Sequence, residues 1–234
     1  MTRAHLKRIA APSTWPVGRK EGKFIARPKG SFSLEMGMPL ITALKDILGL
    51  VKTRKEGKLV LNTKEIFVNG KRRKDEKFMI GLMDVVSIGE LEKSYRMMLD
   101  KNAVLRLVPV SGSESSVKLC KVIGKRTVKN GRIQLSFHDG RSYIGAPAHA
   151  VGDTLVLALP KNDVVQHLKL EDGSNAYITG GSNVGSTGVI EHISGDTVML
   201  KIGDEVVEVA KRFVFVTGKD KPLINDKPSS NAAP

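Results

Sequence analysis

Short runs of β-forming residues, separated by tight turns, dominate the second half of this chain and limit what it can fold into. After residue 95 such runs occupy 104–108, 117–123, 132–137 and 154–159. Turns rich in Gly, Asn, Asp and Ser separate them, and each run has the length of one strand. From residue 176 the pattern tightens to five short strands, AYIT, TGVIEHI, DTVMLKI, EVVEV and FVFV. Five strands joined by tight turns are typical of a small barrel that closes to remove its edges.

The first half of the chain mixes helix and strand signals. Pro39 opens a segment whose apolar residues recur at helical spacing, and Gly49 follows as a stop signal. After the basic stretch 52–58, the run LVLNTK fits a short helix or a strand equally well. Strands are predicted at 65–69 and 84–88. The first of them ends in Asn-Gly, which predicts a type I′ hairpin because both central positions of that turn need a positive φ.

The N-terminal segment, residues 1–37, carries many cations and prolines and little apolar periodicity. Such a segment buries too little apolar surface to order itself, so we expect an extended basic arm that takes its shape from a partner. Trp15, the single tryptophan, lies in this arm. Two interpretations of its indole stay open: it packs on the neighbouring domain, or it stacks on a base or ribose.

Positive charge is concentrated in the N-terminal two-thirds of the chain. The 234 residues carry a formal net charge of +14, and such an excess favours association with nucleic acid or an anionic membrane. Residues 1–152 hold 30 basic and 13 acidic side chains, whereas residues 153–209 hold 3 and 9. Four consecutive cations, Lys71 to Lys74, follow the Asn-Gly turn. Because they repel one another, they either face a polyanion or form a solvated turn.

Several classes of protein and site find no support in the sequence. No apolar stretch approaches the roughly 18 to 20 residues of a membrane-spanning helix, and the N-terminus lacks the apolar region of a signal peptide, so we expect a cytoplasmic protein without membrane contact. The lone Cys120 and five scattered histidines offer no metal site. The loop TGGSNVGSTG lacks the Lys-Ser/Thr of a phosphate-binding loop. His138 and Asp139 could form an acid/base pair, but a hairpin turn containing Asp-Gly is the simpler explanation for these two residues. We expect no enzyme, no cofactor and no small-molecule substrate.

Nine sequence blocks, in order along the chain, resemble a known family. They are HLKRIAAPSTW, PLITALKDIL, the IFVNGK hairpin with Asp75 after it, GLMDVVSI, KLCKV, HDGR, GDTLVLALP, YITGGSNVGSTGVI and KDKPLI. Colinear from about residue 5 to 225, they resemble the small-ribosomal-subunit protein number four of the archaeal and eukaryotic type. The short tail is more similar to the archaeal members of that family.

The resemblance implies an α+β, multi-module fold. Behind the arm at 1–37 it implies an αL-type RNA-binding domain at 38–104, a central β domain at 105–170, an SH3-like KOW barrel at 171–217 and a tail at 218–234. The chain departs from the αL pattern at Met83, where Gly is usual. In αL domains the helical pair and the loop after the first strand face the RNA backbone. The corresponding residues here are Lys45, Lys52, Arg54, Lys55, Lys58, Lys71, Arg72, Arg73 and Lys74.

The function that the resemblance implies is that of a structural constituent of the small ribosomal subunit, which binds rRNA and supports subunit assembly and translation. Its partners would be small-subunit ribosomal RNA and neighbouring ribosomal proteins. The alternative is a KOW-containing translation or transcription factor that binds RNA reversibly. Further RNA-binding residues are expected outside the αL surface: Arg3, His5, Lys7, Arg8, Trp15, Arg19, Lys20, Lys23, Lys118, Lys121, Lys125, Arg126, Asn183, Lys211 and Arg212.

The acidic strands of the expected barrel need a separate interpretation. Their carboxylates are Glu191, Asp196, Asp204, Glu205 and Glu208. We therefore expect only the loop 179–188 and a basic exit to approach RNA, while the remaining wall faces solvent or a basic neighbouring protein. The basic exit consists of Lys211, Arg212, Lys219 and Lys221.

Overall fold

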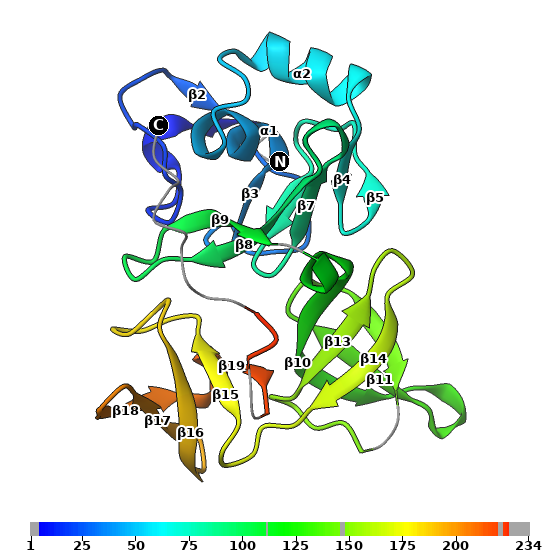
Figure 1. The fold of residues 1–234 in the computed structure, drawn as a ribbon, viewed down its shortest axis with the longest axis vertical. Coiled ribbons are helices and arrows are strands. Elements are labelled where there is room, and N and C mark those ends of the chain that lie inside the picture. The colour runs from blue at the N-terminus through cyan, green and yellow to red at the C-terminus, as the bar shows by residue number, and fades with distance from the viewer. Residues whose placement is uncertain (1–4, 111, 146–147, 220–221, 225–234) are drawn as a thin grey trace. The chain divides into compact units, whose positions relative to one another are not determined.

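The structure is a computed structural model that describes residues 5–110, 112–145, 148–219 and 222–224. Its described residues form two compact units, the first holding 5–99 and 103–115 with the gap at 111, and the second holding the remainder. Strands predominate over the few helices in both units (Figure 1). This layout is compatible with the expected α+β, multi-module class. No helix in the described part of the chain is long and apolar enough to cross a membrane.

A five-stranded antiparallel sheet forms the centre of the first unit. In sheet order its strands are β5 (Lys71–Arg72), β4 (Ile66–Val68), β7 (Val85–Ile88), β8 (Lys93–Leu99) and β9 (Leu105–Val110). Two short pairs accompany it, β1 (Leu6–Lys7) with β2 (Phe24–Ile25) and β3 (Gly37–Pro39) with β6 (Met79–Gly81). The strand expected at 104–108 pairs with β8 as β9. The first compact unit accordingly includes β9.

The helices of the first unit lie in the segment between β3 and β4. The apolar run after Pro39 begins as α1 (Leu40–Thr42) and continues as a π-helical turn at Ala43–Ile47. Gly49 follows with φ +62°, the left-handed conformation that suits a glycine after a helix. The ambiguous run LVLNTK belongs to the second helix, α2 (Arg54–Thr63).

A glycine inside α2 determines how closely the two helical segments approach. Gly57 is buried, and a Cβ atom at this position would collide with Cδ1 of Ile41 in α1. Glycine costs roughly 1 kcal/mol of helix propensity relative to alanine. Its presence here is explained by the close packing of α2 on α1.

The N-terminal arm is fixed by contacts within its own unit, which differs from the expectation that a partner gives it its shape. Trp15 is 3% exposed, and its Nε1 donates to the carbonyl oxygens of Leu34 at 2.9 Å and Gly37 at 3.0 Å. A large buried ring with a satisfied N–H anchors a segment that is otherwise poor in apolar residues. Of the two interpretations of Trp15, the structure supports packing.

The second unit contains two further five-stranded antiparallel sheets. The second sheet has the order β12 (Ser142–Gly145), β11 (Ile133–Phe137), β10 (Val117–Thr127), β13 (Thr154–Ala158) and β14 (Asp163–Leu168). The third sheet has the order β18 (Glu205–Ala210), β17 (Thr197–Ile202), β16 (Thr187–Ser194), β15 (Asn175–Ile178) and β19 (Val214–Gly218). All five strands predicted after residue 176 are present. Short 3-10 turns in the two units lie at Arg8–Ala10, Gly89–Leu91, Gly112–Ser116, Lys129–Gly131 and Lys211–Phe213.

Candidate nucleic-acid interface

The N-terminal half of α2 presents cations to solvent. Thr53 caps the helix, because its Oγ1 accepts from Glu56 N at 3.2 Å while Glu56 Oε2 accepts from Thr53 N. This capping box fixes the first turn and thereby the direction of its side chains. The cations that flank and begin the helix are all exposed: Lys52, Arg54, Lys55 and Lys58. Lys45, in the preceding π-helical turn, is half-buried, and its Nζ lies 3.9 Å from Asp46.

Two of the α2 cations are engaged by a carboxylate of their own unit. Arg54 Nε donates to Glu76 Oε2 at 2.8 Å, and Lys58 Nζ lies 3.5 Å from Glu76 Oε1. The hydrogen bond from Arg54 is the main cause that lowers the pKa of Glu76 below its ordinary value. Glu76 therefore stays ionised at neutral pH. Lys52 and Lys55 remain the cations of α2 that are free of this carboxylate.

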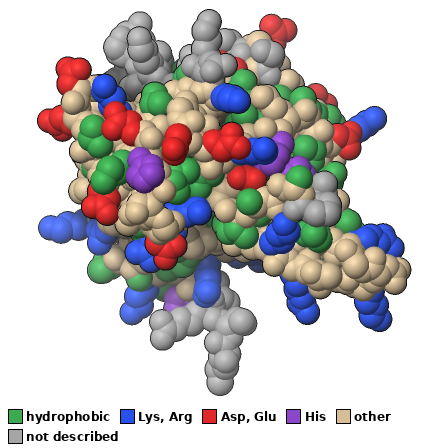
Figure 2. All heavy atoms as spheres, turned by 90° about the horizontal axis from the view of Figure 1, so that it is seen from below, with side chains coloured by type: hydrophobic (Ala, Val, Ile, Leu, Met, Phe, Trp, Pro, Cys, Tyr) green, Lys and Arg blue, Asp and Glu red, His purple; other side chains and the backbone are tan. Residues whose placement is uncertain are grey.

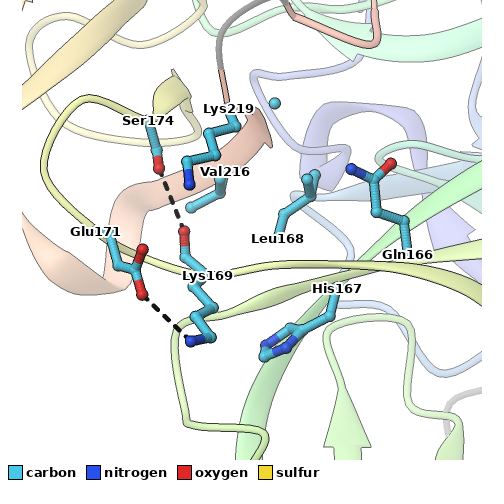
Figure 3. Close-up of a pocket in the computed structure, with 9 residues that line it drawn as sticks. Gln166, His167, Leu168, Lys169, Glu171, Ser174, Val216 and Lys219 are labelled. Atoms are coloured by element: carbon cyan, nitrogen blue, oxygen red, sulfur yellow. Dashed lines mark hydrogen bonds and ion pairs between the residues drawn. The ribbon is translucent and has the colours of Figure 1, made fainter.

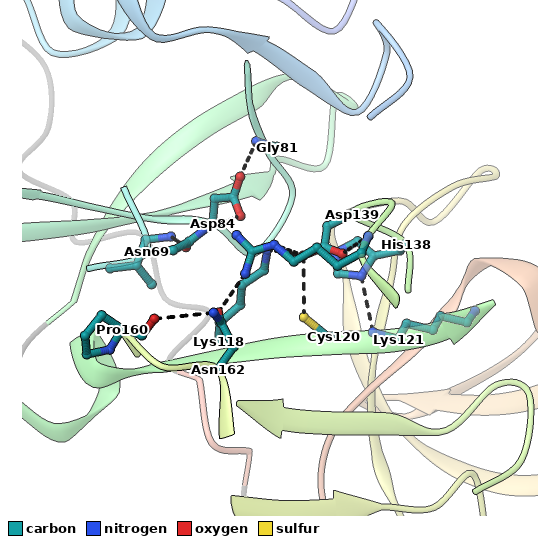
Figure 4. A network of polar contacts seen from close by, with 12 residues as sticks. Asn69, Gly81, Asp84, Lys118, Cys120, Lys121, His138, Asp139, Pro160 and Asn162 are labelled. Carbon is teal, nitrogen blue, oxygen red and sulfur yellow. Dashed lines mark hydrogen bonds and ion pairs between the residues drawn. The ribbon is translucent and has the colours of Figure 1, made fainter. Parts of the chain in front are cut away.

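The basic hairpin forms as predicted. Asn69 and Gly70 have φ values of +53° and +71°, as a type I′ turn requires. The Asn69 side chain is buried and donates to Asp84 Oδ1 at 2.8 Å, while its own Oδ1 accepts from Val85 N (Figure 4). Asp84 Oδ2 also accepts from Gly81 N. The turn is thus held from inside by a buried polar network.

The four cations of the hairpin divide into exposed and packed side chains. Lys71, Arg72 and Lys74 are exposed, whereas Arg73 is half-buried with its guanidinium 4.3 Å from the Phe78 ring centroid. Arg72 Nη2 approaches the carbonyl oxygens of Asn62 at 3.3 Å and Lys64 at 3.5 Å, at the C-terminal end of α2. The hairpin therefore lies against the end of α2 (Figure 1). We call the exposed cations of this region the α2–β5 surface: Lys52, Lys55, Lys71, Arg72 and Lys74.

The predicted residues of the N-terminal arm fall into two groups. His5, Lys7, Arg19, Lys20 and Lys23 are exposed, and Arg3 lies outside the described residues. Arg8 is 6% exposed and its Nη1 donates to Gly18 O at 2.7 Å and Glu21 Oε2 at 3.0 Å. Together with the buried Trp15, this arginine belongs to the internal structure of the arm. Neither side chain presents its polar group at the surface, which argues against the RNA contacts predicted for them.

Lys118, on β10, is also an internal residue. Its Nζ lies 2.7 Å from Asp139 Oδ2, and the two side chains are 1% and 2% exposed (Figure 4). Burial acts to raise the pKa of Asp139, but the Lys118 ammonium and the Arg141 N–H outweigh it and keep the pKa below its ordinary value. This internal pairing of a buried charge argues against the RNA contact predicted for Lys118.

Lys121 connects the second sheet to the third. It is 7% exposed, and its Nζ donates to the carbonyl oxygens of Lys211 at 3.1 Å, Arg212 at 2.8 Å and Val214 at 2.6 Å. Burial, with a smaller effect of the Lys211 charge, lowers the pKa of Lys121 to about 8. The three carbonyls match the three donors of an ammonium group. These internal hydrogen bonds stabilise the second unit and argue against the RNA contact predicted for Lys121.

The remaining predicted residues lie at the surface of the second unit. Lys125 and Arg126 are exposed near the end of β10, and Arg212 is exposed with its guanidinium 4.6 Å from the Phe213 ring centroid. Asn183 and the side chain of Lys211 are half-buried. Lys129 and Arg132, which were not among the predicted residues, are exposed at the β10–β11 turn. An Asn-Gly pair followed by a cation marks this turn as it marks the first hairpin.

Exposed acidic residues distinguish the third sheet. Glu191, Asp196, Asp204, Glu205 and Glu208 are all exposed, as the prediction of an acidic wall requires. Figure 2, which views the molecule from below, shows Asp and Glu side chains interspersed with Lys and Arg. Within the described residues no salt bridge involves any of these five carboxylates.

A cavity of about 190 Å³ lies between the end of β14 and β19 (Figure 3). Polar groups that line it contact one another, since Lys169 Nζ lies 3.5 Å from Glu171 Oε1 and Ser174 Oγ donates to Lys169 O at 3.4 Å. The other lining residues include His167, whose Nε2 lies 2.7 Å from Asp153 Oδ2. Across the described residues, no group of three or more His, Cys, Asp or Glu side chains is placed to hold a metal ion. We assign no cofactor to this cavity.

Comparison with known proteins gives consistent matches. The profile of the Ribosomal family S4e matches residues 91–164, and that of the RS4NT (NUC023) domain matches residues 2–30. The chain is 38% identical to the small ribosomal subunit protein eS4 of Korarchaeum cryptofilum, over 94% of this chain and 95% of the relative. Identity to the eS4 protein of Methanosphaera stadtmanae is 36%, over 96% of each chain.

A solved structure of an S4e protein also matches this chain. The crystal structure of the 30S ribosomal protein S4e from Thermoplasma acidophilum superposes with a TM-score of 0.72 and 31% identity. The match covers 81% of this chain and 99% of that one.

Proposed function

The chain belongs to the ribosomal family S4e, in its archaeal type, and from this membership we propose that it binds ribosomal RNA and supports assembly of the small subunit and translation. The near full-length match to small-subunit eS4 proteins carries the proposal. The family consists of structural ribosomal proteins, which are generally not enzymes, so we propose no catalytic activity. The site of action would be the cytoplasmic ribosome, with ribosomal RNA and neighbouring ribosomal proteins as partners.

The α2–β5 surface is proposed as the main contact with the RNA backbone. Its five cations are exposed and are not held by Glu76. Arginine grips two phosphate oxygens at once, whereas lysine acts as a point charge. Folded RNA presents phosphates, 2′-hydroxyls and a shallow minor groove, so recognition would rest on shape and backbone charge. The proposal includes an αL-type domain for the first unit.

The second unit is proposed to contribute a smaller part of the interface. Lys125, Arg126 and Arg212 supply exposed cations, and the loop 179–188 would approach RNA beside Asn183. We propose a central β domain for the second sheet and a KOW barrel for the third. The exposed carboxylates of the third sheet argue against phosphate contact along its outer face, since like charges repel. That face would turn to solvent or to a basic neighbouring protein.

A matched pair of triple variants tests the RNA contact. Lys71→Ala, Arg72→Ala and Lys74→Ala together remove three cations from the α2–β5 surface. Lys161→Ala, Lys169→Ala and Lys201→Ala together remove three exposed cations from the acidic segment 153–209. Affinity for small-subunit rRNA is measured against salt concentration. Each lost phosphate contact reduces the slope of log affinity against log salt by roughly 0.7 to 0.9. The first variant should flatten the slope by about 2.1 to 2.7, and the second should leave it unchanged. Equal effects would remove the α2–β5 surface from the interface.

Retention on the subunit distinguishes a structural protein from a cycling factor. Small subunits are sedimented through sucrose in high salt, and the protein is followed in the gradient fractions. A structural constituent stays with the particle. Release into the top fractions would favour a factor that binds reversibly.

A further inference from the structure

Phe24 is an exposed aromatic ring in the N-terminal arm. It lies on β2 directly opposite Lys7 of β1, and it is 53% exposed. The other six phenylalanines are buried or half-buried. Single exposed apolar residues are common on protein surfaces, so exposure alone carries no argument. The side chains that surround the Phe24 ring distinguish it from other exposed apolar residues.

Potentially cationic side chains surround the Phe24 ring. Directly opposed residues of an antiparallel pair place their side chains on one face, which brings Lys7 beside the ring. Lys23 Nζ lies 5.4 Å from the ring centroid. The His5 ring lies 5.4 Å away at an interplanar angle of 84°. No described carboxylate forms a salt bridge with Lys7 or Lys23; Glu21, the acid nearest in sequence, pairs with Arg8.

The Phe24 ring is half exposed and takes part in no parallel stacking with His5, because that contact is edge to face. The Lys23 ammonium sits near the outer limit of about 6 Å for a cation–π contact, on a flexible side chain that can move to an anion. An accessible aromatic face bordered by unpaired cations is the arrangement with which proteins hold single-stranded nucleic acid.

We propose that Phe24 is a stacking platform for one unpaired base of the bound RNA, with Lys7 and Lys23 holding the phosphates beside that base. The proposal rests on the RNA binding proposed above. In the bound state the base takes the position over the ring, and the Lys23 ammonium moves to the adjacent phosphate. The role that the sequence left open for Trp15 therefore falls to Phe24, nine residues further along the arm.

Two substitutions separate stacking from apolar bulk. Phe24→Leu keeps an apolar side chain but removes the π face, whereas Phe24→Trp keeps a stacking ring. Stacking of one base on an aromatic ring is worth about 1–3 kcal/mol, so Phe24→Leu should weaken binding of the full chain to small-subunit rRNA roughly 5-fold to 160-fold. Phe24→Trp should bind about as tightly as the wild type. Val206→Ala is the matched control, because Val206 is also 53% exposed but lies on the acidic third sheet.

The salt dependence identifies the kind of contact that is lost. Phe24→Leu should lower affinity with an unchanged salt slope, since it removes no phosphate contact. Lys7→Gln with Lys23→Gln should flatten the slope by about 1.4, because each lost contact to a single strand contributes roughly 0.7. Thermal melting of each variant shows that the arm remains folded. An affinity of Phe24→Leu equal to that of the wild type would overturn the platform.

Photocrosslinking of wild-type protein in intact small subunits gives an independent readout. Irradiation at short wavelength links stacked aromatic rings to bases, and tryptic digestion should release the residue in the peptide 24–29. A nucleotide attached to this peptide supports the proposal; a peptide of another protein attached there would overturn it in favour of a protein contact. Failure of the wild type to bind rRNA at all would instead refute the proposed function. Loss of the platform alone leaves the effect of the α2–β5 triple variant intact.

Discussion

Met83 combines a buried side chain with a backbone conformation that L-amino acids adopt at a cost. Its φ is +66° and it is fully buried. Met83 N donates to Met97 O at 2.9 Å, which ties this turn to β8. The resemblance to αL domains implied Gly at this position, and the left-handed backbone of Met83 is the conformation that glycine adopts without strain. Backbone strain at Met83 is therefore offset by the burial of its side chain.

Replacing Met83 with Gly sets these two effects against each other. Relief of strain is worth about 1–2 kcal/mol, whereas loss of a buried methionine side chain costs about 2–5 kcal/mol. We expect the free energy of unfolding to fall by about 1–3 kcal/mol in urea denaturation. Ala103→Gly is the control, since Ala103 has φ +59° but only a half-buried methyl group; it should be neutral or stabilising. A similar gain from both variants would contradict the importance of burial at Met83.

The buried Lys118–Asp139 ion pair should also contribute to the free energy of unfolding. Lys118→Met leaves the Asp139 carboxylate buried, with Arg141 Nε still at 3.4 Å from it. Removing one partner of a buried pair costs about 3–5 kcal/mol, and we expect the lower end because Arg141 compensates in part. Lys118→Met with Asp139→Leu should recover most of the loss, since no buried charge remains. Lys129→Met, at an exposed position, should change the urea midpoint little. A small effect of Lys118→Met alone would contradict this account.

Strands, turns and helices differed in how far the sequence predicted them. The Asn-Gly hairpin and the strands after residue 176 were recognisable because turn chemistry and apolar alternation agree there. By contrast, β8, β12 and β14 were missed. β12 carries exposed side chains at three of its four positions, so its sequence shows no buried face. β14 is exposed or half-buried along most of its length for the same reason.

The site shows the same division between local and distant information. Charge and turn position predicted the exposed cations of α2 and β5. They did not predict that Arg8, Lys118 and Lys121 are used internally, because their partners lie 10 to 93 residues away along the chain. Helix α2 was ambiguous from its period alone, and its capping box, Thr53 with Glu56, was the unused local signal. Partners distant in sequence become visible only in the folded chain.

Glu76 makes the stability of the α2 region dependent on pH. Its pKa is lowered mainly by the hydrogen bond from Arg54. A carboxyl group whose pKa is depressed on folding contributes stability above its unfolded pKa of about 4.5, and that contribution is lost as pH falls through the folded value. Glu76→Gln should therefore lower stability at neutral pH and flatten the loss of stability below pH 4.5. The measurement is urea denaturation followed by circular dichroism from pH 7 to pH 2.

The control for this titration is Glu65→Gln, at an exposed carboxylate close to β4. It removes the same charge without breaking the contact to α2. If both variants gave the same acid profile, the effect would come from net charge, and the Arg54–Glu76 pair would have no special role.

At the scale of the whole molecule, charge is separated along the chain. Residues 1–152 hold 30 basic and 13 acidic side chains, and residues 153–209 hold 3 and 9. The structure refines this division, since part of the positive charge in the first segment is used internally. Exposed cations that a polyanion could contact lie on the α2–β5 surface, in the arm and at the β10–β11 turn. Positive potential attracts RNA and negative potential repels it, so this charge distribution would also orient the protein on the RNA.

Lysine acetylation of the full chain, free and bound to small-subunit rRNA, tests this distribution. Binding should protect those exposed lysines of the basic segment that are proposed to lie against phosphate: Lys7, Lys20, Lys23, Lys52, Lys55, Lys71, Lys74 and Lys125. Lys161, Lys169 and Lys201 should stay reactive, since they lie among carboxylates that RNA avoids. Lys118 and Lys121 should be unreactive in both states because they are buried. Uniform protection of both exposed sets would mean that net charge alone attracts RNA, and protection confined to the second set would reverse the proposed orientation.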